Sequence, residues 1–179
     1  NPQEQIIAYA DDALKHFVES AQQTQWGENT LFILVADHGA NLPCPYEMVL
    51  PYHKMTVYIF GAGITPSIVE QPTSQIDIWP TVLSMLGIDY NNNSLGIDIL
   101  HNHRPYAFFV SDDYLGVSDG EYFWCYGIQT QREVLYRMGS GENILTEEPE
   151  RATEMRTFGM NMQRVNLMAI DNKWTDPCE

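Results

Sequence analysis

Basic residues are scarce in this 179-residue chain, which has 9 Lys and Arg against 24 Asp and Glu and a formal net charge of −15. Binding to a nucleic-acid backbone requires a surface rich in Lys and Arg, so this balance argues against nucleic acid as a partner. It argues equally against docking on an anionic lipid surface.

Long apolar runs and cysteines are also scarce. No stretch reaches the roughly 18 consecutive apolar residues that a membrane-spanning helix needs, and no secretory signal pattern opens the chain. The three cysteines, Cys44, Cys125 and Cys178, have neither CxxC spacing nor the pattern of a disulfide framework, so we expect buried or inert thiols. The chain starts without Met, inside an expected helix, so we expect it to be a piece of a longer protein.

The composition is that of a globular chain, with 44% hydrophobic and 18% charged residues, and its length suits one domain with a real core. Apolar residues recur with a period near 3.6 over residues 4–24, which predicts an amphipathic helix. Continuous apolar runs over 30–37 and 55–63 predict strands that are covered on both faces, as in a parallel sheet. A plausible N-cap, Ser74, and an apolar stripe predict the next helix over 74–88.

After about residue 100 the pattern changes. Residues 106–127 and 133–138 contain apolar and aromatic runs separated by turn residues, which predicts antiparallel hairpins. Residues 147–171 predict a closing amphipathic helix. We therefore expect an α/β layer over residues 1–104, followed by a hairpin subdomain with a C-terminal helix over residues 105–179.

An Asp and a His follow the first predicted strand directly, in the stretch LFILVADHGANLP. In open α/β sheets ligands gather at the carboxyl ends of strands, and Gly39 allows a sharp exit from the strand. A carboxylate and a neutral imidazole together favour Mn²⁺ or Zn²⁺ over Ca²⁺, which prefers oxygen ligands. Asp37 and His38 are therefore candidate metal ligands that need one or two more ligands from elsewhere. The spacing fits equally well a hydrogen-bonded pair that caps a turn.

Several blocks of sequence, in a fixed order, resemble one known family. The blocks are VADHG, PYHKMTVYIFGAG, SQIDIWPTVLSMLGI and SLGIDIL. They resemble the alkaline phosphatase superfamily, most closely its sulfatase branch, which includes lipoteichoic acid synthases and related phosphoglycerol transferases. The resemblance implies the C-terminal part of an alkaline phosphatase-like sandwich, with a mostly parallel sheet and flanking helices, plus a small antiparallel sheet and a closing helix.

The resemblance also implies a metal site. In that family the Asp-His pair helps to hold the catalytic metal, so Asp37 and His38 are the implied ligands here. The family's nucleophile is a Thr, or a modified Cys in true sulfatases, and it lies upstream of the part present here. We therefore expect no catalytic nucleophile in this segment, no activity of the segment alone, and the missing N-terminal half of the same polypeptide as its partner.

Two further polar residues are candidate substrate contacts. His53 precedes a strand where relatives approach the active site, and Asn41 closely follows the Asp-His pair. Both are candidate substrate-binding residues, with a surface histidine and ordinary turn chemistry as the respective alternatives. We interpret Asp77 and Thr81 as capping and packing residues.

The implied function is that of a metal-dependent, sulfatase-like phosphoglycerol transferase or phosphodiesterase. Its substrate would be a phospholipid head-group, a glycerophosphate or a sulfate ester. By the same resemblance, the enzyme would work at the extracytoplasmic face of the cell membrane or in the periplasm. The competing hypothesis is a non-catalytic α/β binding or assembly module that retains only the scaffold.

Overall fold

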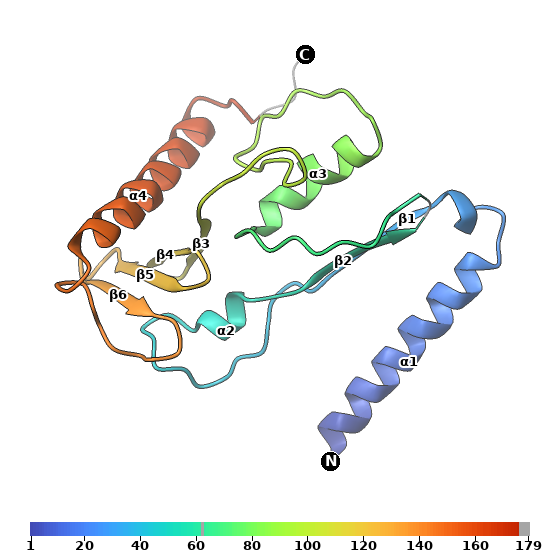
Figure 1. Ribbon diagram of the computed structural model, residues 1–179, viewed down its shortest axis with the longest axis horizontal. Coiled ribbons are helices and arrows are strands. Elements are labelled where there is room, and N and C mark those ends of the chain that lie inside the picture. Colours follow the sequence, from blue (N-terminus) through green and yellow to red (C-terminus); the bar gives the residue numbers. More distant parts are fainter. Residues whose placement is uncertain (62, 176–179) are drawn as a thin grey trace. The chain divides into compact units, whose positions relative to one another are not determined.

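The computed structural model describes residues 1–61 and 63–175 (Figure 1). The chain divides into two compact units: Asn1–Gly39 with Lys54–Ser67, and Ala40–His53 with the chain from Ile68 onward. The predicted division at residue 104 stays a prediction. Among the helices of the described residues, none combines the length and apolar character that a membrane crossing requires.

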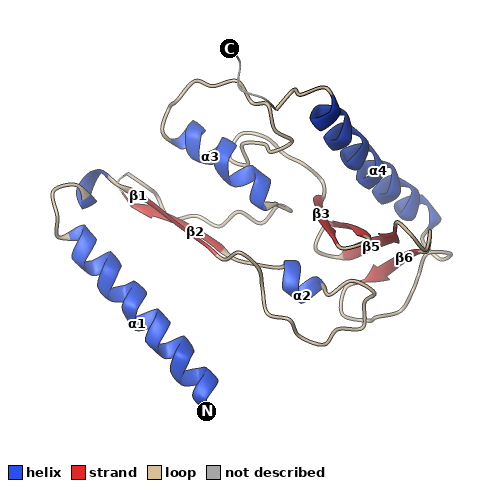
Figure 2. Cartoon of the chain, turned by 180° about the vertical axis from the view of Figure 1, so that it is seen from behind, coloured by secondary structure: helices blue, strands red, loops and turns tan. Residues whose placement is uncertain are grey.

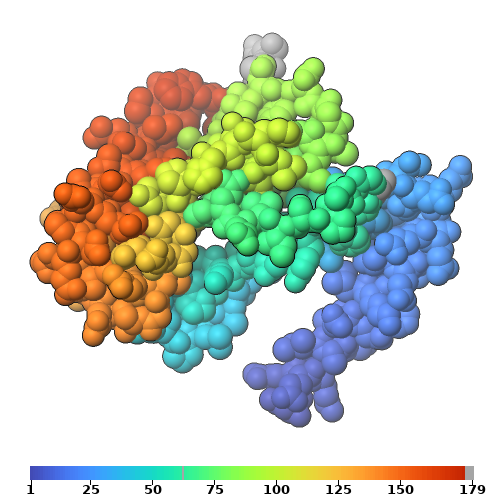
Figure 3. Space-filling view, in the orientation of Figure 1, coloured from blue at the N-terminus to red at the C-terminus, as the bar shows by residue number. Residues whose placement is uncertain are grey.

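The first unit begins with helix α1, Pro2–Gln22, which confirms the helix predicted over 4–24. The side chain of Asn1 caps it by accepting a hydrogen bond from the backbone N–H of Gln3 at 3.2 Å. The helix is the dark-blue segment of Figure 3. Ala21 is buried, whereas the large apolar side chains that are exposed are Ile6, Ile7, Tyr9, Leu14 and Phe17. A short 3-10 turn, η1 (Gly27–Asn29), leads into the first strand.

Strands β1 (Leu31–Val35) and β2 (Val57–Gly61) form a two-stranded antiparallel sheet (Figure 2). Phe32 and Phe60 are paired in register, and their rings stack with centroids 5.2 Å apart. The resemblance implied a mostly parallel sheet, whereas the two sheets formed by the described residues are antiparallel. A continuous apolar run indicates that both faces of a strand are apolar, but it carries no information about the direction of the neighbouring strand.

The helix predicted over 74–88 is confirmed, as a 3-10 turn η2 (Gln75–Asp77) that continues into helix α3 (Ile78–Met85). Ser74 and Asp77 form a capping box, in which the Asp77 carboxylate accepts a hydrogen bond from the Ser74 N–H at 2.8 Å.

The predicted hairpins are confirmed as a four-stranded antiparallel sheet in the order β3-β4-β5-β6. Its strands are β3 (Ala107–Ser111), β4 (Tyr114–Ser118), β5 (Tyr122–Gly127) and β6 (Glu133–Arg137). The closing helix is confirmed as α4 (Pro149–Asp171).

Both faces of the four-stranded sheet are covered. On one face α4 packs through Ala152 and Met155 against a buried cluster that includes Trp124 (Figure 1). On the other face the segment that ends in the short helix α2 (Leu50–His53) packs through Met48 and Leu50. The second unit is thus a layered structure in which a segment from before β2 closes a sheet from the C-terminal half of the chain.

Candidate functional site

Asp37 and His38 lie just beyond the end of β1, where the chain bends. The side chain of Asp37 is 89% exposed and that of His38 is 48% exposed. One carboxylate oxygen of Asp37 accepts a hydrogen bond from the backbone N–H of His38 at 2.9 Å. The other carboxylate oxygen lies 3.7 Å from Nε2 of His38. The two adjacent side chains therefore turn toward each other instead of pointing to opposite faces, as they would on a regular strand.

The backbone selects the tautomer of His38. Its Nδ1 lies 2.8 Å from the carbonyl oxygen of Gly39. A carbonyl oxygen can only accept a hydrogen bond, so Nδ1 carries the proton, and in the neutral ring Nε2 is the unprotonated nitrogen. This arrangement is typical of metal-binding histidines, which donate their other ring N–H to a carboxylate, carbonyl or water.

The spacing of the two possible ligand atoms also fits a shared ion. Neighbouring ligands of a tetrahedral metal, each about 2.0–2.2 Å from it, lie about 3.4 Å apart. The observed separation between Asp37 Oδ2 and His38 Nε2 is 3.7 Å. A carboxylate oxygen and an imidazole nitrogen form a suitable donor set for Zn²⁺ or Mn²⁺. Within residues 1–61 and 63–175, no group of three or more His, Cys, Asp or Glu side chains could hold a metal ion.

Two other Asp–His pairs provide an internal comparison. On α1, Nδ1 of His16 lies 2.8 Å from the Asp12 carbonyl oxygen and 3.4 Å from its carboxylate. In the second unit, Nδ1 of His101 lies 2.6 Å from the Asp98 carboxylate. In both pairs the carboxylate faces Nδ1. At His38 it faces Nε2, while Nδ1 is held by the backbone, so this pair has a different geometry from the other two.

His53 ends α2 and is a packed residue of the second unit. Its ring stacks on Phe109 with centroids 5.2 Å apart, and Tyr52 meets it edge-on at 5.5 Å. Burial lowers the pKa of His53 below its usual value, against an opposing effect of the Asp112 charge. The ring is therefore neutral near pH 7. Its role as a substrate contact stays a prediction.

Asn41 lies in an exposed loop, where the N–H of Leu42 bonds to the carbonyl oxygen of Ala40 at 2.9 Å. Asn41 and His53 belong to the second unit, whereas Asp37 and His38 belong to the first. The structure brings the two candidate metal ligands, Asp37 and His38, together. The substrate role of Asn41 stays a prediction.

Asp77 and Thr81 are structural residues, as predicted. Both are 1% exposed. The Asp77 carboxylate forms a buried ion pair with Arg104 and accepts a hydrogen bond from the Ile97 N–H at 2.9 Å. The Thr81 hydroxyl donates to the Asp77 carbonyl oxygen at 2.7 Å and accepts from the Ile99 N–H at 3.1 Å.

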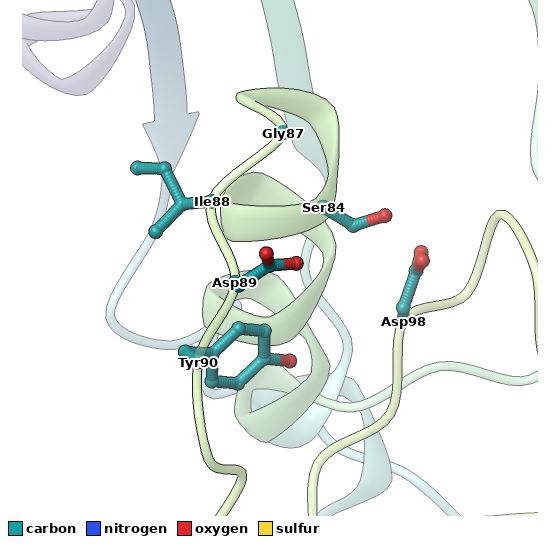
Figure 4. Close-up of a pocket in the computed structure, with 6 residues that line it drawn as sticks. All are labelled: Ser84, Gly87, Ile88, Asp89, Tyr90 and Asp98. Atoms are coloured by element: carbon teal, nitrogen blue, oxygen red, sulfur yellow. The ribbon is translucent and has the colours of Figure 1, made fainter.

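A polar hollow that the sequence did not indicate lies beside the C-terminal end of α3 (Figure 4). Its volume is about 320 Å³, and it is lined by Ser84, Gly87, Ile88, Asp89, Tyr90 and Asp98. Burial raises the pKa of Asp98, but hydrogen bonds from Ser84, His101 and the Leu100 N–H lower it overall.

The Ser, His and Asp groups near this hollow do not form a catalytic triad. In a triad one imidazole nitrogen faces the serine and the other faces the carboxylate. Here Nδ1 of His101 lies 2.6 Å from Asp98 and 3.4 Å from the Ser84 hydroxyl, so the same nitrogen faces both groups. We therefore assign no nucleophile to Ser84.

The cysteines agree with the expectation of inert thiols where they are described. Cys125 is buried in the four-stranded sheet, and burial raises the pKa of its thiol to about 12. Cys44 is half-buried and also has a free thiol. Cys178 lies outside the described residues.

Comparison with known proteins gives a consistent result. Residues 3–88 match the family model described as Sulfatase. The chain is similar to the lipoteichoic acid synthase-like YvgJ of Bacillus subtilis (strain 168), with 26% identity over 61% of this chain and 22% of that protein. It is also similar to the choline-sulfatase of Rhizobium meliloti (strain 1021), with 26% identity over 46% of this chain and 17% of that enzyme. The chain thus spans about a fifth of the length of these relatives.

The fold is similar to that of a solved structure. A protein in the alkaline phosphatase superfamily from Vibrio parahaemolyticus superposes with a TM-score of 0.70 and 24% sequence identity. The match covers 93% of this chain and 41% of that one. It confirms the predicted α/β fold class and its resemblance to this superfamily.

Proposed function

Because residues 3–88 of this chain match the Sulfatase family model, we propose that the chain is the C-terminal part of a larger metal-dependent enzyme. The proposed enzyme is a sulfatase-like phosphoglycerol transferase or phosphodiesterase that acts on a phosphodiester or a sulfate ester. Its substrate would be a phospholipid head-group, a glycerophosphate or a sulfate ester, and its N-terminal half would complete the active site.

The geometry of Asp37 and His38 is the observation that supports this proposal best. Two potential ligand atoms lie 3.7 Å apart beyond the end of a strand. The Gly39 carbonyl holds the His38 ring with Nε2 on the carboxylate side. A turn cap needs only the hydrogen bond between the Asp37 carboxylate and the His38 N–H, and it does not require this tautomer.

In the proposed enzyme, this chain supplies metal ligands and hydrogen-bond donors to the substrate. Asp37 and His38 hold the divalent metal, with Mn²⁺ or Zn²⁺ as the candidates. When bound, such an ion activates an oxygen nucleophile and stabilises negative charge on the phosphoryl or sulfuryl oxygens. His53 and Asn41 donate hydrogen bonds to substrate oxygens. The Thr or modified Cys nucleophile is assigned by family resemblance to the N-terminal half, and the working location to the extracytoplasmic side of the membrane or the periplasm.

Calorimetric titration of the full-length protein with Mn²⁺ and with Zn²⁺ tests the metal role. We expect Asp37→Ala and His38→Ala each to weaken metal binding by more than about tenfold, because each removes a direct ligand. We also expect both variants to lose phosphodiester turnover while their unfolding transitions barely change.

Asp12→Ala is the matched control, because it removes the carboxylate of another exposed Asp–His pair. Its metal affinity and turnover are expected to equal those of the unmodified protein. Metal binding that survives Asp37→Ala would rule out this site and leave the hypothesis of a non-catalytic binding or assembly module. A large loss of stability in both Asp37 and His38 variants would instead favour a turn-capping pair.

A further inference from the structure

Four rings form a continuous stack in the second unit. The imidazole of His53 lies on the ring of Phe109, with centroids 5.2 Å apart and 23° between the ring planes. Phe109 stacks on Phe123 at 5.9 Å and 12°, and Phe123 stacks on Tyr136 at 6.1 Å and 23°. Phe123 is fully buried and Tyr136 is 5% exposed. The stack therefore leads from the core of the four-stranded sheet out to His53.

A glycine on β4, the strand between β3 and β5, makes this stack of rings possible. Gly116 of β4 is paired in register with Phe109 of β3, and β4 lies between β3 and β5, which carries Phe123. A Cβ atom at position 116 would lie 2.5 Å from Cε2 of Phe109. Any side chain there would displace the ring, so the glycine allows Phe109 to lie across β4 and reach Phe123.

The position of the His53 ring is further restricted by Tyr52, which meets it edge-on at 5.5 Å and 83°. Because the ring is neutral near pH 7, it offers one N–H donor and one acceptor nitrogen at its edge. A ring confined in this way presents those two atoms in a defined plane.

We propose that Phe109 is a positioning residue, which fixes the plane of the His53 imidazole for hydrogen bonding to the phosphoryl or sulfuryl oxygens of the substrate. This proposal rests on the substrate-binding role proposed above for His53. Ordering one mobile side chain on binding weakens affinity by about two- to tenfold. The stack avoids this loss because the ring is already confined. The antiparallel sheet, which lies outside the segment that matches the Sulfatase family, thereby contributes to substrate binding.

Steady-state kinetics of the full-length protein with bis(p-nitrophenyl) phosphate test the proposal. Phe109→Leu removes the aromatic ring and is expected to raise KM about two- to tenfold with little change in kcat. Phe109→Tyr keeps the ring and is expected to preserve KM. Phe108→Leu is the matched control. Phe108 directly precedes Phe109 on β3, so its side chain points to the opposite face of the sheet, where it packs against the cluster on the α4 side.

A second readout separates positioning from a general loss of packing. The pKa of His53, followed by NMR of its ring Cε1–H, is expected to rise toward 6.5 in Phe109→Leu as the ring becomes more exposed. Phe108→Leu is expected to leave this pKa unchanged. If Phe109→Leu does not fold, Phe109→Met, which conserves volume better, serves for both measurements.

The His53→Ala variant distinguishes the two possible failures. If His53→Ala raises KM but Phe109→Leu does not, the positioning role of Phe109 is wrong and the substrate role of His53 stands. If His53→Ala leaves KM unchanged, the substrate role of His53 is wrong, and the positioning proposal is overturned with it.

Discussion

At the scale of single residues, Asp37 and Asp77 have opposite environments. Asp37 is 89% exposed at a strand end, where its second carboxylate oxygen faces an imidazole nitrogen. Asp77 is 1% exposed, and its carboxylate is saturated by the N–H groups of Ser74 and Ile97 and by the guanidinium of Arg104. The Asp37 carboxylate is open to solvent, where a metal ion can reach it, whereas the buried and saturated carboxylate of Asp77 stabilises the fold.

The buried ion pair predicts a large effect on stability. Asp77→Ala leaves the guanidinium of Arg104 buried without its counter-charge, so we expect the free energy of unfolding to fall by about 3–5 kcal/mol. Urea denaturation measures this difference. Asp89→Ala, at an exposed position, is the control and is expected to change stability by less than about 0.5 kcal/mol. A similar small effect for both variants would contradict the structural role of Asp77.

At the scale of secondary-structure elements, α4 is joined to the sheet by an ion pair and by close packing of side chains. Glu133 of β6 accepts two hydrogen bonds from Arg156 of α4, each 2.7 Å long, and one from the Trp124 indole, also 2.7 Å. Gly159, in the middle of α4, lies against Val117 and Trp124. The glycine that interrupts the helical pattern in the sequence is therefore a contact point between helix and sheet.

Replacement of this glycine tests the contact. A Cβ atom at position 159 would lie 2.8 Å from Cγ2 of Val117 and 2.9 Å from Cζ3 of Trp124, both in the core. Helix propensity alone favours alanine by about 1 kcal/mol, but overpacking a core costs about 1–3 kcal/mol. We expect Gly159→Ala to lower the melting temperature, and Asn161→Ala, at an exposed position on the same helix, to maintain or raise it. A higher melting temperature for Gly159→Ala would show that helix and sheet are not this close.

At the scale of the whole molecule, the chain spans about a fifth of the length of its curated relatives. Its described residues lack a group of three or more metal-binding side chains. Two ligands do not complete the coordination shell of a catalytic metal, which usually has three protein ligands. As part of the function proposed above, we expect the remaining ligands to come from another part of the polypeptide.

This dependence predicts that the 179-residue chain is inactive by itself. With Mn²⁺ or Zn²⁺ present, we expect no turnover of bis(p-nitrophenyl) phosphate above the metal-only rate, whereas the full-length protein turns it over. The Asp37→Ala variant of the isolated chain is the control for weak, adventitious activity. Metal-dependent turnover by the isolated chain that disappears in this variant would show that the chain already contains a complete site.

The sequence by itself determined the elements and several of their ends. The period of α1, the N-cap signal at Ser74 and the aromatic runs of β3 to β6 are local patterns, and each one yielded the correct type of element. Local patterns suffice here because helix and strand propensities depend on residues only a few positions apart. The order of the blocks also predicted the resemblance to the sulfatase branch, whose family model matches residues 3–88.

Only the tertiary structure decided which residues lie together. It gave β1 and β2 their antiparallel pairing, brought Arg104 to Asp77 across 27 positions, and placed Phe109 beneath His53. It also showed which nitrogen of His38 faces the carboxylate. These features depend on packing and hydrogen bonds between segments far apart in the chain, or on the exact bend of the backbone after a strand, and neither periodicity nor spacing in a sequence encodes them directly.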